Sequence, residues 1–238
     1  MMLELCIPAY NEAAIIREAV SRVAEALESA GIREWRIVVV DNASTDDTSE
    51  QVRALAHPRI SVLRIEEKGK GAALRAAARV REDADARTRF GFIDADLSAD
   101  PADIALLLAP LARDEADVVI GSRLLDAALV RRGFLRSVSS RLFNAFRRAL
   151  LGIRVVDSQC GLKVMNAEGR AVLRSCSEPG WFLDLEFLAK AERAGLRIRE
   201  LPVHWDESRF KERSSKLRVF RDGLGALSAM RRIRARLD

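Results

Sequence analysis

Short apolar runs alternate with longer segments of helical periodicity along the first half of the chain. Residues 37–40, Ile-Val-Val-Val, form a continuous β-branched run, which is typical of a central parallel strand buried on both faces. From Glu12 to Ala30 the apolar residues recur at helical spacing, and Gly31 closes the segment. The same patterns predict further strands at 3–7, 60–65, 90–93 and 117–120, and further helices at 44–57, 72–80 and 101–112.

Strand and helix alternate throughout this half, which predicts an α/β fold: a Rossmann-like, mainly parallel sheet flanked by helices. The second half continues with a basic helical region at 135–151, a helix near 185–194, a strand at 197–203 and a basic C-terminal helix. The chain has 238 residues and neither an internal repeat nor a low-complexity linker. We therefore expect one compact domain over 1–217, built from halves 1–120 and 121–217, and an amphipathic extension at 218–238.

Charge is distributed unevenly along the chain, although the net charge is only +5. Residues 1–120 carry 15 Lys and Arg against 22 Asp and Glu, whereas residues 121–174 carry 11 against 3 and residues 209–238 carry 10 against 3. The basic blocks predict that the second half meets an anionic partner, such as phosphates, an acidic membrane face or nucleic acid.

Cysteine usage and hydropathy bear on the compartment. The three cysteines follow no metal-ligand spacing, which favours a reducing environment. No signal-peptide pattern precedes the first strand, and the longest apolar stretch, 104–112, is too short to span a bilayer. These features predict a cytoplasmic protein that is soluble or peripheral to a membrane.

The most informative candidate chemistry is the pair Asp94 and Asp96 at the end of the strand 90–93. Residues two apart on a strand point to one side, so these carboxylates require a cation between them. A hard divalent cation, Mg²⁺ or Mn²⁺, that also holds a phosphate-bearing ligand meets this requirement. An ordinary solvated acidic turn is the alternative interpretation.

Further polar groups follow other predicted strands, and open parallel sheets bind ligands beyond the carboxyl ends of their strands. Tyr10 either stacks on a flat base or packs on the first helix. Asp41, or Glu12, accepts hydrogen bonds from ribose hydroxyls, although Asp41 is alternatively a turn residue. Lys70, set between two glycines, either reaches a phosphate or marks a flexible turn. The chain has no P-loop and no Gly-x-Gly-x-x-Gly after the first strand, which excludes a Walker ATPase and an ordinary NAD fold.

The order and spacing of these motifs resemble the inverting family 2 glycosyltransferases, and within them the dolichyl- or polyprenyl-phosphate sugar synthases. In the first half the resemblance rests on Pro8-Ala-Tyr-Asn-Glu12, Val40-Asp-Asn-Ala-Ser-Thr-Asp46, Lys68-Gly-Lys-Gly-Ala72, Asp94-Ala-Asp-Leu97 and Gly121-Ser-Arg123. In the second half it rests on Asp157-Ser-Gln-Cys-Gly-Leu-Lys163, Trp181-Phe-Leu-Asp-Leu-Glu186, Glu200-Leu-Pro-Val203, Trp205 and Ser215-Lys216. It spans residues 3–217.

The resemblance implies a GT-A fold, with the nucleotide sugar held by 1–120 and the acceptor by 121–217. It implies metal-dependent, inverting transfer of a hexose to a dolichyl or polyprenyl phosphate. The expected nucleotide-sugar residues are Pro8, Tyr10, Glu12, Asp41, Lys70, Asp94, Ala95 and Lys216. Asp94 and Asp96 are the expected ligands of Mg²⁺ or Mn²⁺, and Asp96 and Arg123 the expected catalytic residues.

Three positions depart from the family pattern. Ser98 stands where some relatives have a metal-binding Gln. The sequence 159–161, Gln-Cys-Gly, is more similar to the glucosyl-type synthases, which favours UDP-glucose over GDP-mannose. At 213–216 the chain has Arg-Ser-Ser-Lys, so the usual Gly before Ser-Lys is replaced.

A lipid phosphate as acceptor sets particular chemical demands. It is already anionic at neutral pH, so it needs cationic positioning more than a strong general base. Arg123, together with Arg136 and Ser140 one helical turn apart, is expected to bind it, although Arg136 is alternatively a solvated surface residue. Asp184 and Glu186 lie on one side if extended and then bind sugar hydroxyls, or they cap the following helix.

The acceptor's lipid chain requires a membrane contact, and two basic segments with apolar stripes are candidates. In the C-terminal segment the stripe consists of Phe220, Leu224, Leu227, Met230, Ile233 and Leu237, among five arginines. Such a helix rests in an anionic interface, or it packs on the core, on a membrane protein or on a second subunit. Residues 135–151 have the same character.

Two other functions are less consistent with the sequence. A family 2 enzyme acting on a glycan hydroxyl usually carries a Glu-Asp pair followed by Gln-x-x-Arg-Trp, and this string is absent. A nucleic-acid-binding module is not expected, because aromatic residues make up only 5% of the chain and the arginines lie on amphipathic helices.

Overall fold

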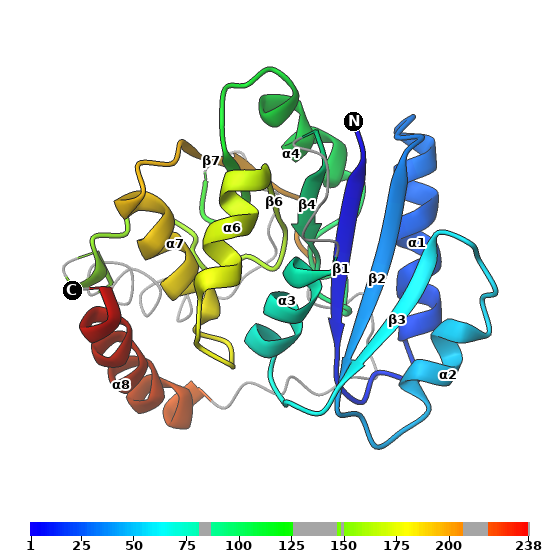
Figure 1. Cartoon of the computed structure of the whole chain (residues 1–238), viewed down its shortest axis with the longest axis horizontal. Helices are drawn as coiled ribbons and strands as arrows, with labels where there is room; N and C mark the ends of the chain where they lie inside the picture. Colours follow the sequence, from blue (N-terminus) through cyan, green and yellow to red (C-terminus); the bar gives the residue numbers. More distant parts are fainter. Residues whose placement is uncertain (81–86, 126–146, 149, 207–218, 238) are drawn as a thin grey trace.

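The computed structural model describes residues 1–80, 87–125, 147–148, 150–206 and 219–237. Within them a seven-stranded sheet runs through the molecule, with helices on both faces (Figure 1). In spatial order the strands are β3 (Ile60–Ile65), β2 (Trp35–Asn42), β1 (Leu3–Ala9), β4 (Arg89–Phe92), β6 (Lys163–Met165), β5 (Val118–Ser122) and β7 (Ile198–Pro202). Neighbouring strands are parallel except where β6 pairs with β4 and β5.

Two apolar layers enclose the sheet. The helices are α1 (Ile16–Ser29), α2 (Thr48–Arg53), α3 (Lys70–Arg79), α4 (Asp103–Ala112), α6 (Ala167–Ser175), α7 (Leu183–Arg193) and α8 (Val219–Leu237). Leu5 and Ile7 of β1 pack in the layer with α1 and α4, whereas Cys6 packs in the layer with α3, α6 and α7. Because both faces are covered, the central strands are apolar at nearly every position.

The predicted α/β fold with a mainly parallel sheet is confirmed. The antiparallel strand β6 was not predicted, because it has only three residues and begins with a lysine. That lysine, Lys163, is nevertheless fully buried. A three-residue strand with a charged inward position carries no readable apolar alternation.

Several helices begin or end away from their predicted positions, for local reasons. Asn11 has a positive φ of 52°, and the turn that follows delays α1 until Ile16. Ala56, with φ 48°, lies in the turn after α2, which has only six residues. α7 begins at Leu183, so Asp184 and Glu186 lie in its first turn and are not extended.

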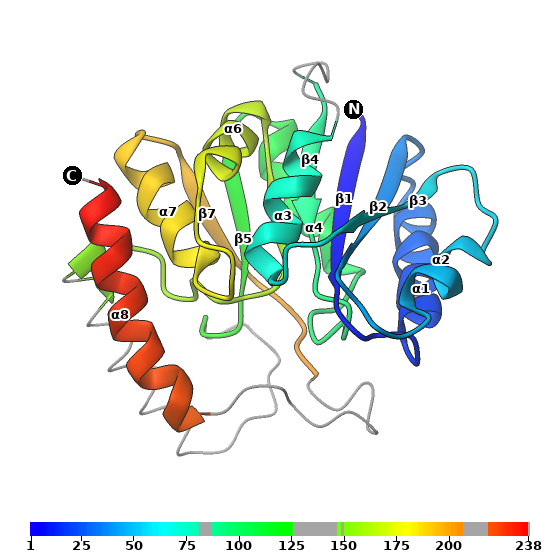
Figure 2. The same ribbon diagram turned by 60° about the horizontal axis from the view of Figure 1, so that its bottom comes forward.

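The predicted basic helical region 135–151 falls mostly outside the described residues. α8 runs beside α7 (Figure 2), and Met230 and Ile233 are buried in the core layer that contains α7. Leu237 packs against the same layer, so the described part of the apolar stripe contacts the protein, which is the alternative to membrane contact. Among the described residues, no helix combines the length and apolarity that crossing a membrane requires.

Candidate functional site

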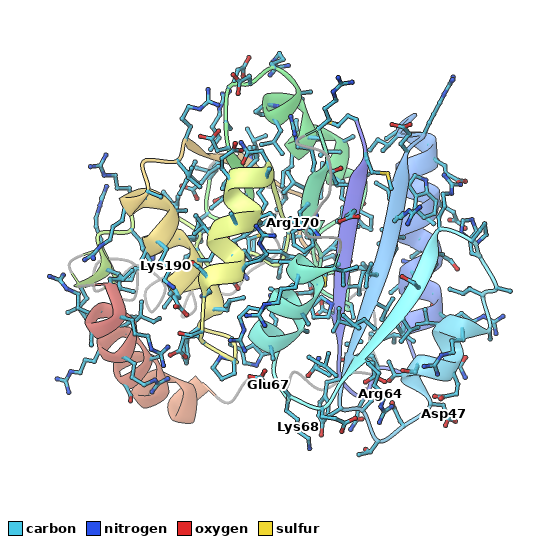
Figure 3. All side chains as sticks on the ribbon, in the orientation of Figure 1. Asp47, Arg64, Glu67, Lys68, Arg170 and Lys190 are labelled. Atoms are coloured by element: carbon cyan, nitrogen blue, oxygen red, sulfur yellow. The ribbon has the colours of Figure 1, made fainter. Side chains whose placement is uncertain are left out.

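A pocket of about 180 Å³ opens at the edge of the sheet where β1, β2 and β4 end. The register pairs Ala9 with Asp41 and Cys6 with Phe92, which brings the residues after these strands together. Figure 3 shows Arg64 and Lys68 at this edge. The lining residues are Pro8, Tyr10, Glu12, Asn42, Lys68, Gly69, Lys70, Asp94, Ala95, Asp96 and Trp181. The pocket thus gathers most of the sequence-predicted nucleotide-sugar residues.

Hydrogen bonds from the segment after β2 fix the loop that carries Tyr10 and Glu12. The backbone N–H of Asn11 donates to Ser44 Oγ at 2.9 Å, and that of Glu12 donates to Thr48 Oγ1 at 2.9 Å. Asn42 donates from Nδ2 to the Ala9 carbonyl at 2.7 Å and accepts from the Gly69 N–H at 3.0 Å. Asn42 was not predicted as a pocket residue, although its place at the end of a central strand is a usable signal.

Asp41 does not line the pocket. Its carboxylate is fully buried and accepts the Ser44 N–H at 2.9 Å and Arg64 Nη1 at 3.2 Å. Burial alone would raise the pKa of Asp41, but hydrogen bonds from Ser44 and Ser49 and the charge of Arg64 lower it. In this geometry Asp41 stabilises the 41–49 turn, which in turn holds the Tyr10 loop.

Asp94 and Asp96 both line the pocket, but strand alternation is not the reason. β4 ends at Phe92, and the two aspartates lie in a turn closed by the Leu97 N–H donating to the Asp94 carbonyl at 3.0 Å. Asp96 Oδ1 accepts the Ser98 N–H at 3.1 Å. The turn, in which Leu97 has φ 47°, therefore presents the carboxylates.

Lys70 places a cation inside the pocket. Its Nζ lies 2.7 Å from Asp94 Oδ1 and 3.8 Å from Asp184 Oδ2. Burial alone would lower the pKa of Lys70, but the two carboxylates raise it above its ordinary value. Burial raises the pKa of Asp94, with Lys70 opposing and Asp96 reinforcing the shift.

The second carboxylate beside Lys70 is itself held by a buried lysine. Lys163 Nζ lies 2.6 Å from Asp184 Oδ1 and donates to the carbonyls of Ser158 at 3.1 Å and Cys160 at 2.7 Å. Lysine and aspartate therefore alternate from β6 to the pocket, in the order Lys163, Asp184, Lys70 and Asp94. Lys163 closes the 157–163 motif, but its ion pair was not predicted, because Asp184 becomes a neighbour only when β6 and α7 pack together.

The glycines on either side of Lys70 admit a second segment. We call residues 177–181 the wall loop, since it carries Trp181 into the pocket. A Cβ on Gly69 would lie 2.1 Å from the Pro179 carbonyl oxygen, and one on Gly71 would lie 2.3 Å from that of Glu178. The start of α3 can therefore contact the wall loop only because both positions lack a side chain.

Asp94 depends on a third glycine, in the Gln-Cys-Gly segment before β6. A Cβ on Gly161 would lie 2.1 Å from Asp94 Oδ2, well inside contact distance. We expect Gly161→Ala to displace the carboxylate and weaken Mn²⁺ binding about 10- to 100-fold, the range typical of lost support for a metal ligand. Mn²⁺ titration followed by electron paramagnetic resonance measures the effect. Gly180→Ala is the control, because a Cβ at that position would have no neighbouring atom within 4 Å; equal Mn²⁺ affinities in the two variants would contradict the prediction.

The carboxylates predicted to bind the sugar have other partners. Asp184 lies between Lys163 and Lys70, and neither it nor Glu186 lines the pocket. Glu186 accepts the N–H groups of Ser177 at 2.9 Å and Glu178 at 2.7 Å. Its carboxylate oxygens are thus bonded to the loop before α7 and not to the first N–H groups of that helix. Glu186 therefore anchors the wall loop.

Arg123 follows β5 at the same edge of the sheet. Its Nε and Nη2 each lie 2.7 Å from a carboxylate oxygen of Asp157, and its guanidinium stacks 4.5 Å from the Trp205 ring centroid. Burial alone would lower the pKa of Arg123, but hydrogen bonding to Asp157 raises it. The pair uses only part of the guanidinium's N–H donors. Of the other predicted residues, Arg136, Ser140 and Lys216 lie outside the described residues.

The donor set fits a hard divalent cation. Asp94 and Asp96 supply carboxylate oxygens, and no group of three or more His, Cys, Asp or Glu side chains suited to a metal is present among the described residues. Mg²⁺ is commonly held by one or two carboxylates and completed by phosphate and water oxygens. The pocket therefore suits a cation that arrives with a diphosphate.

The chain is similar in sequence to known proteins. The family described as "Glycosyl transferase family 2" matches residues 4–169. Glycosyltransferase AglD of Haloferax volcanii is 32% identical over 229 residues, which are 94% of this chain and 35% of AglD. Dolichyl-phosphate beta-glucosyltransferase of Drosophila melanogaster is 32% identical over 226 residues, which are 86% of this chain and 67% of that protein. The chain thus spans about a third of AglD and two thirds of the Drosophila protein.

A solved structure establishes the fold class. Glucosyl-3-phosphoglycerate synthase from Mycobacterium tuberculosis, in complex with Mn²⁺, UDP-glucose and phosphoglyceric acid, aligns with a TM-score of 0.70. The identity is 22%, and the alignment covers 98% of this chain and 80% of that chain. The mixed seven-stranded sheet flanked by helices is a GT-A fold.

Proposed function

Because the chain belongs to glycosyl transferase family 2, we propose that it transfers a hexose from a nucleotide sugar to a dolichyl or polyprenyl phosphate, with inversion at the anomeric carbon. The observation that carries the proposal is the convergence of Tyr10, Lys70, Asp94 and Asp96 on one pocket. Relatives named dolichyl-phosphate beta-glucosyltransferase support the acceptor class. We propose UDP-glucose as the donor, with GDP-mannose next, because the Gln-Cys-Gly segment at 159–161 is similar to the glucosyl-type synthases.

On the donor side, Tyr10 stacks on the base, and Pro8, Glu12 and Asn42 complete the nucleotide wall. Asp94 and Asp96 would hold Mg²⁺ or Mn²⁺, which supplies charge neutralisation of the diphosphate when bound. Lys70, which pairs with Asp94 at 2.7 Å, adds a fixed positive charge beside these carboxylates and offsets the charge that develops on the leaving nucleoside diphosphate. Lys216 is proposed to contribute in the same way.

On the acceptor side, the lipid phosphate is its own nucleophile, because its second pKa is about 6. Two anions must approach each other, so cationic positioning is the main requirement. Arg123 meets it with a planar guanidinium held in place by Asp157, and Arg136 and Ser140 are proposed to complete the phosphate site. Attack opposite the leaving group converts an α-linked donor into a β-linked product.

The acceptor places the enzyme at a membrane. We propose a peripheral location at the cytoplasmic face, where the basic blocks meet anionic headgroups. Because the described part of the α8 stripe is buried in the core, this contact would involve the arginines more than that stripe. A membrane protein or a second copy of the chain is a proposed partner, and nucleic acid is not.

Arg123→Lys tests the acceptor role while keeping a positive charge beside Asp157. A lysine has a single ammonium group and cannot bind Asp157 at two points while it also contacts the acceptor phosphate. We therefore expect the KM for lipid phosphate to rise about 10-fold and the KM for nucleotide sugar to change less than about 2-fold. Steady-state kinetics with each substrate varied in turn measures both. Equal increases in the two KM values would reassign Arg123 to a structural role.

The proposal itself is tested with a panel of donors. The purified chain is incubated with anionic vesicles containing polyprenyl phosphate, Mn²⁺, and radiolabelled UDP-glucose, GDP-mannose or other nucleotide sugars. We expect labelled lipid with UDP-glucose and loss of the product when Mn²⁺ is chelated. The absence of labelled lipid with every donor would contradict the proposed function.

A further inference from the structure

The wall loop is connected to α8 as well as to the pocket. The side chain of Glu178 is only 4% exposed, and its carboxylate accepts hydrogen bonds from Arg232 Nε and Nη2, both at 3.2 Å. Arg236 Nη1 lies 3.1 Å from the same carboxylate. Both arginines lie on the C-terminal part of α8, which runs beside α7 in Figure 2. α8 thus holds the loop between α6 and α7 through the buried acid of Glu178.

The backbone of the same residue faces the donor pocket. The Glu178 carbonyl oxygen lies against Gly71, and the Pro179 carbonyl accepts the Ala72 N–H at 3.0 Å. Further along the wall loop, the Trp181 ring centroid lies 5.4 Å from Lys70 Nζ. A displacement of Glu178 would therefore shift Lys70 in two ways, through the start of α3 and through the indole of Trp181.

Stability alone does not account for this arrangement. A buried carboxylate loses hydration and is retained only with partners, and an apolar side chain of similar size is often as stable there. Glu186 already binds the N–H groups of Ser177 and Glu178. The Glu178 carboxylate adds a different constraint: it fixes the distance between α8 and the pocket wall.

We propose that α8 is a positioning element of the donor pocket, in which Arg232 and Arg236 hold Glu178 and thereby set Trp181 and the start of α3 against Lys70. The inference rests on the proposed function and deepens it, since the pocket is the nucleotide-sugar site. Glu178 is a positioning residue, because it acts on the donor only through the wall loop.

Kinetics and nucleotide binding test the inference with Glu178→Gln, which keeps the shape and removes the charge. We expect the Kd of UDP with Mn²⁺ and the KM for the donor to rise about 10-fold, with the KM for the acceptor unchanged. A small misplacement caused by a substitution remote from the chemistry can cost up to about 100-fold in activity. The double variant Arg232→Gln with Glu178→Gln should bind UDP no more weakly than Glu178→Gln alone, because the two substitutions remove the same ion pair. Arg231→Gln, at an exposed neighbouring position on the same helix, is the matched control and should bind UDP with Mn²⁺ as tightly as the wild type.

A spectroscopic readout separates this inference from the proposed function. In protein labelled with 5-fluorotryptophan, the ¹⁹F resonance of Trp181, assigned with Trp181→Phe, should shift in Glu178→Gln and not in Arg231→Gln. Trp35, which is buried among the residues of α1 and β1, reports that the fold is intact. An unchanged Trp181 resonance together with unchanged UDP affinity would overturn the inference. If the wild type binds no nucleotide, the proposed function fails and the Trp181 resonance alone decides the positioning role.

Discussion

Asp96→Asn should abolish metal-dependent transfer while the fold stays intact. The amide keeps the shape of the side chain but removes the charge that a divalent cation requires. Because lost support around a ligand already costs about 10- to 100-fold in affinity, loss of a ligand should lower kcat/KM at least about 100-fold at fixed Mn²⁺. The measurement is initial rate against Mn²⁺ concentration.

Asp47→Asn is the matched control for this change, because Asp47 is exposed and does not line the pocket. It removes the same charge and should leave the rate within about 2-fold, the effect expected of a surface substitution. Both variants should unfold at the wild-type urea midpoint. Turnover of Asp96→Asn equal to the wild type would remove Asp96 from the metal site.

Lys163→Met should destabilise the fold more than any substitution on the surface. Lys163 is fully buried, and its removal leaves the Asp184 carboxylate, itself only 3% exposed, with Lys70 at 3.8 Å as its remaining ion-pair partner among the described residues. Breaking one half of a buried pair costs about 3–5 kcal/mol, a large part of a typical domain's free energy of unfolding. Urea denaturation followed by circular dichroism measures this loss.

A second variant separates the charge from the packing. In Lys163→Met with Asp184→Asn the uncompensated carboxylate is gone, so we expect recovery of at least about half of the lost free energy of unfolding. Recovery would show that the lysine is needed because of the acid. A loss below about 1 kcal/mol in the single variant would mean that water or Lys70 already satisfies Asp184, and the alternating charges would then contribute little to stability.

The periodic segments of this protein were predictable from the sequence, because burial on both faces leaves a clear pattern. The run at 37–40 marked a central strand, and β2 contains it. The place of Asp94 and Asp96 at the pocket was also predictable, because ligand sites of open parallel sheets lie beyond the carboxyl ends of the strands, whereas their binding of a cation stays a prediction. The turn that points these carboxylates into the pocket was not predictable, since the positive φ of Leu97 leaves no periodic pattern in the sequence.

The parts that escaped prediction depend on contacts between distant segments. Lys163 acquires its partner only when β6 lies beside β4 and α7 packs over it. The contact of the wall loop with α3 was not predictable, because it depends on the space that Gly69 and Gly71 leave beside a distant segment. Asp184 and Glu186 were predicted either to bind sugar hydroxyls, if extended, or to cap the next helix. α7 begins at Leu183, before both of them, and their partners come from distant segments that the sequence does not reveal.

The C-terminal helix shows the same limit. Its apolar stripe and arginines fit a membrane surface or the protein core equally well as a pattern. The burial of Met230 and Ile233 and the ion pairs of Arg232 and Arg236 with Glu178 assign the described part to the protein. A sequence pattern records that a helix has an apolar face, whereas only the fold records what covers it.

The central claim is that Asp94 and Asp96, which follow β4, would hold a divalent cation that neutralises the donor diphosphate. The most direct measurement is a crystal structure of the protein soaked with UDP-glucose and Mn²⁺, with the metal located by its anomalous scattering. We expect the manganese peak about 2 Å from a carboxylate oxygen of Asp96 and from diphosphate oxygens, with the base beside Tyr10. A manganese or nucleotide position away from this pocket would contradict the account.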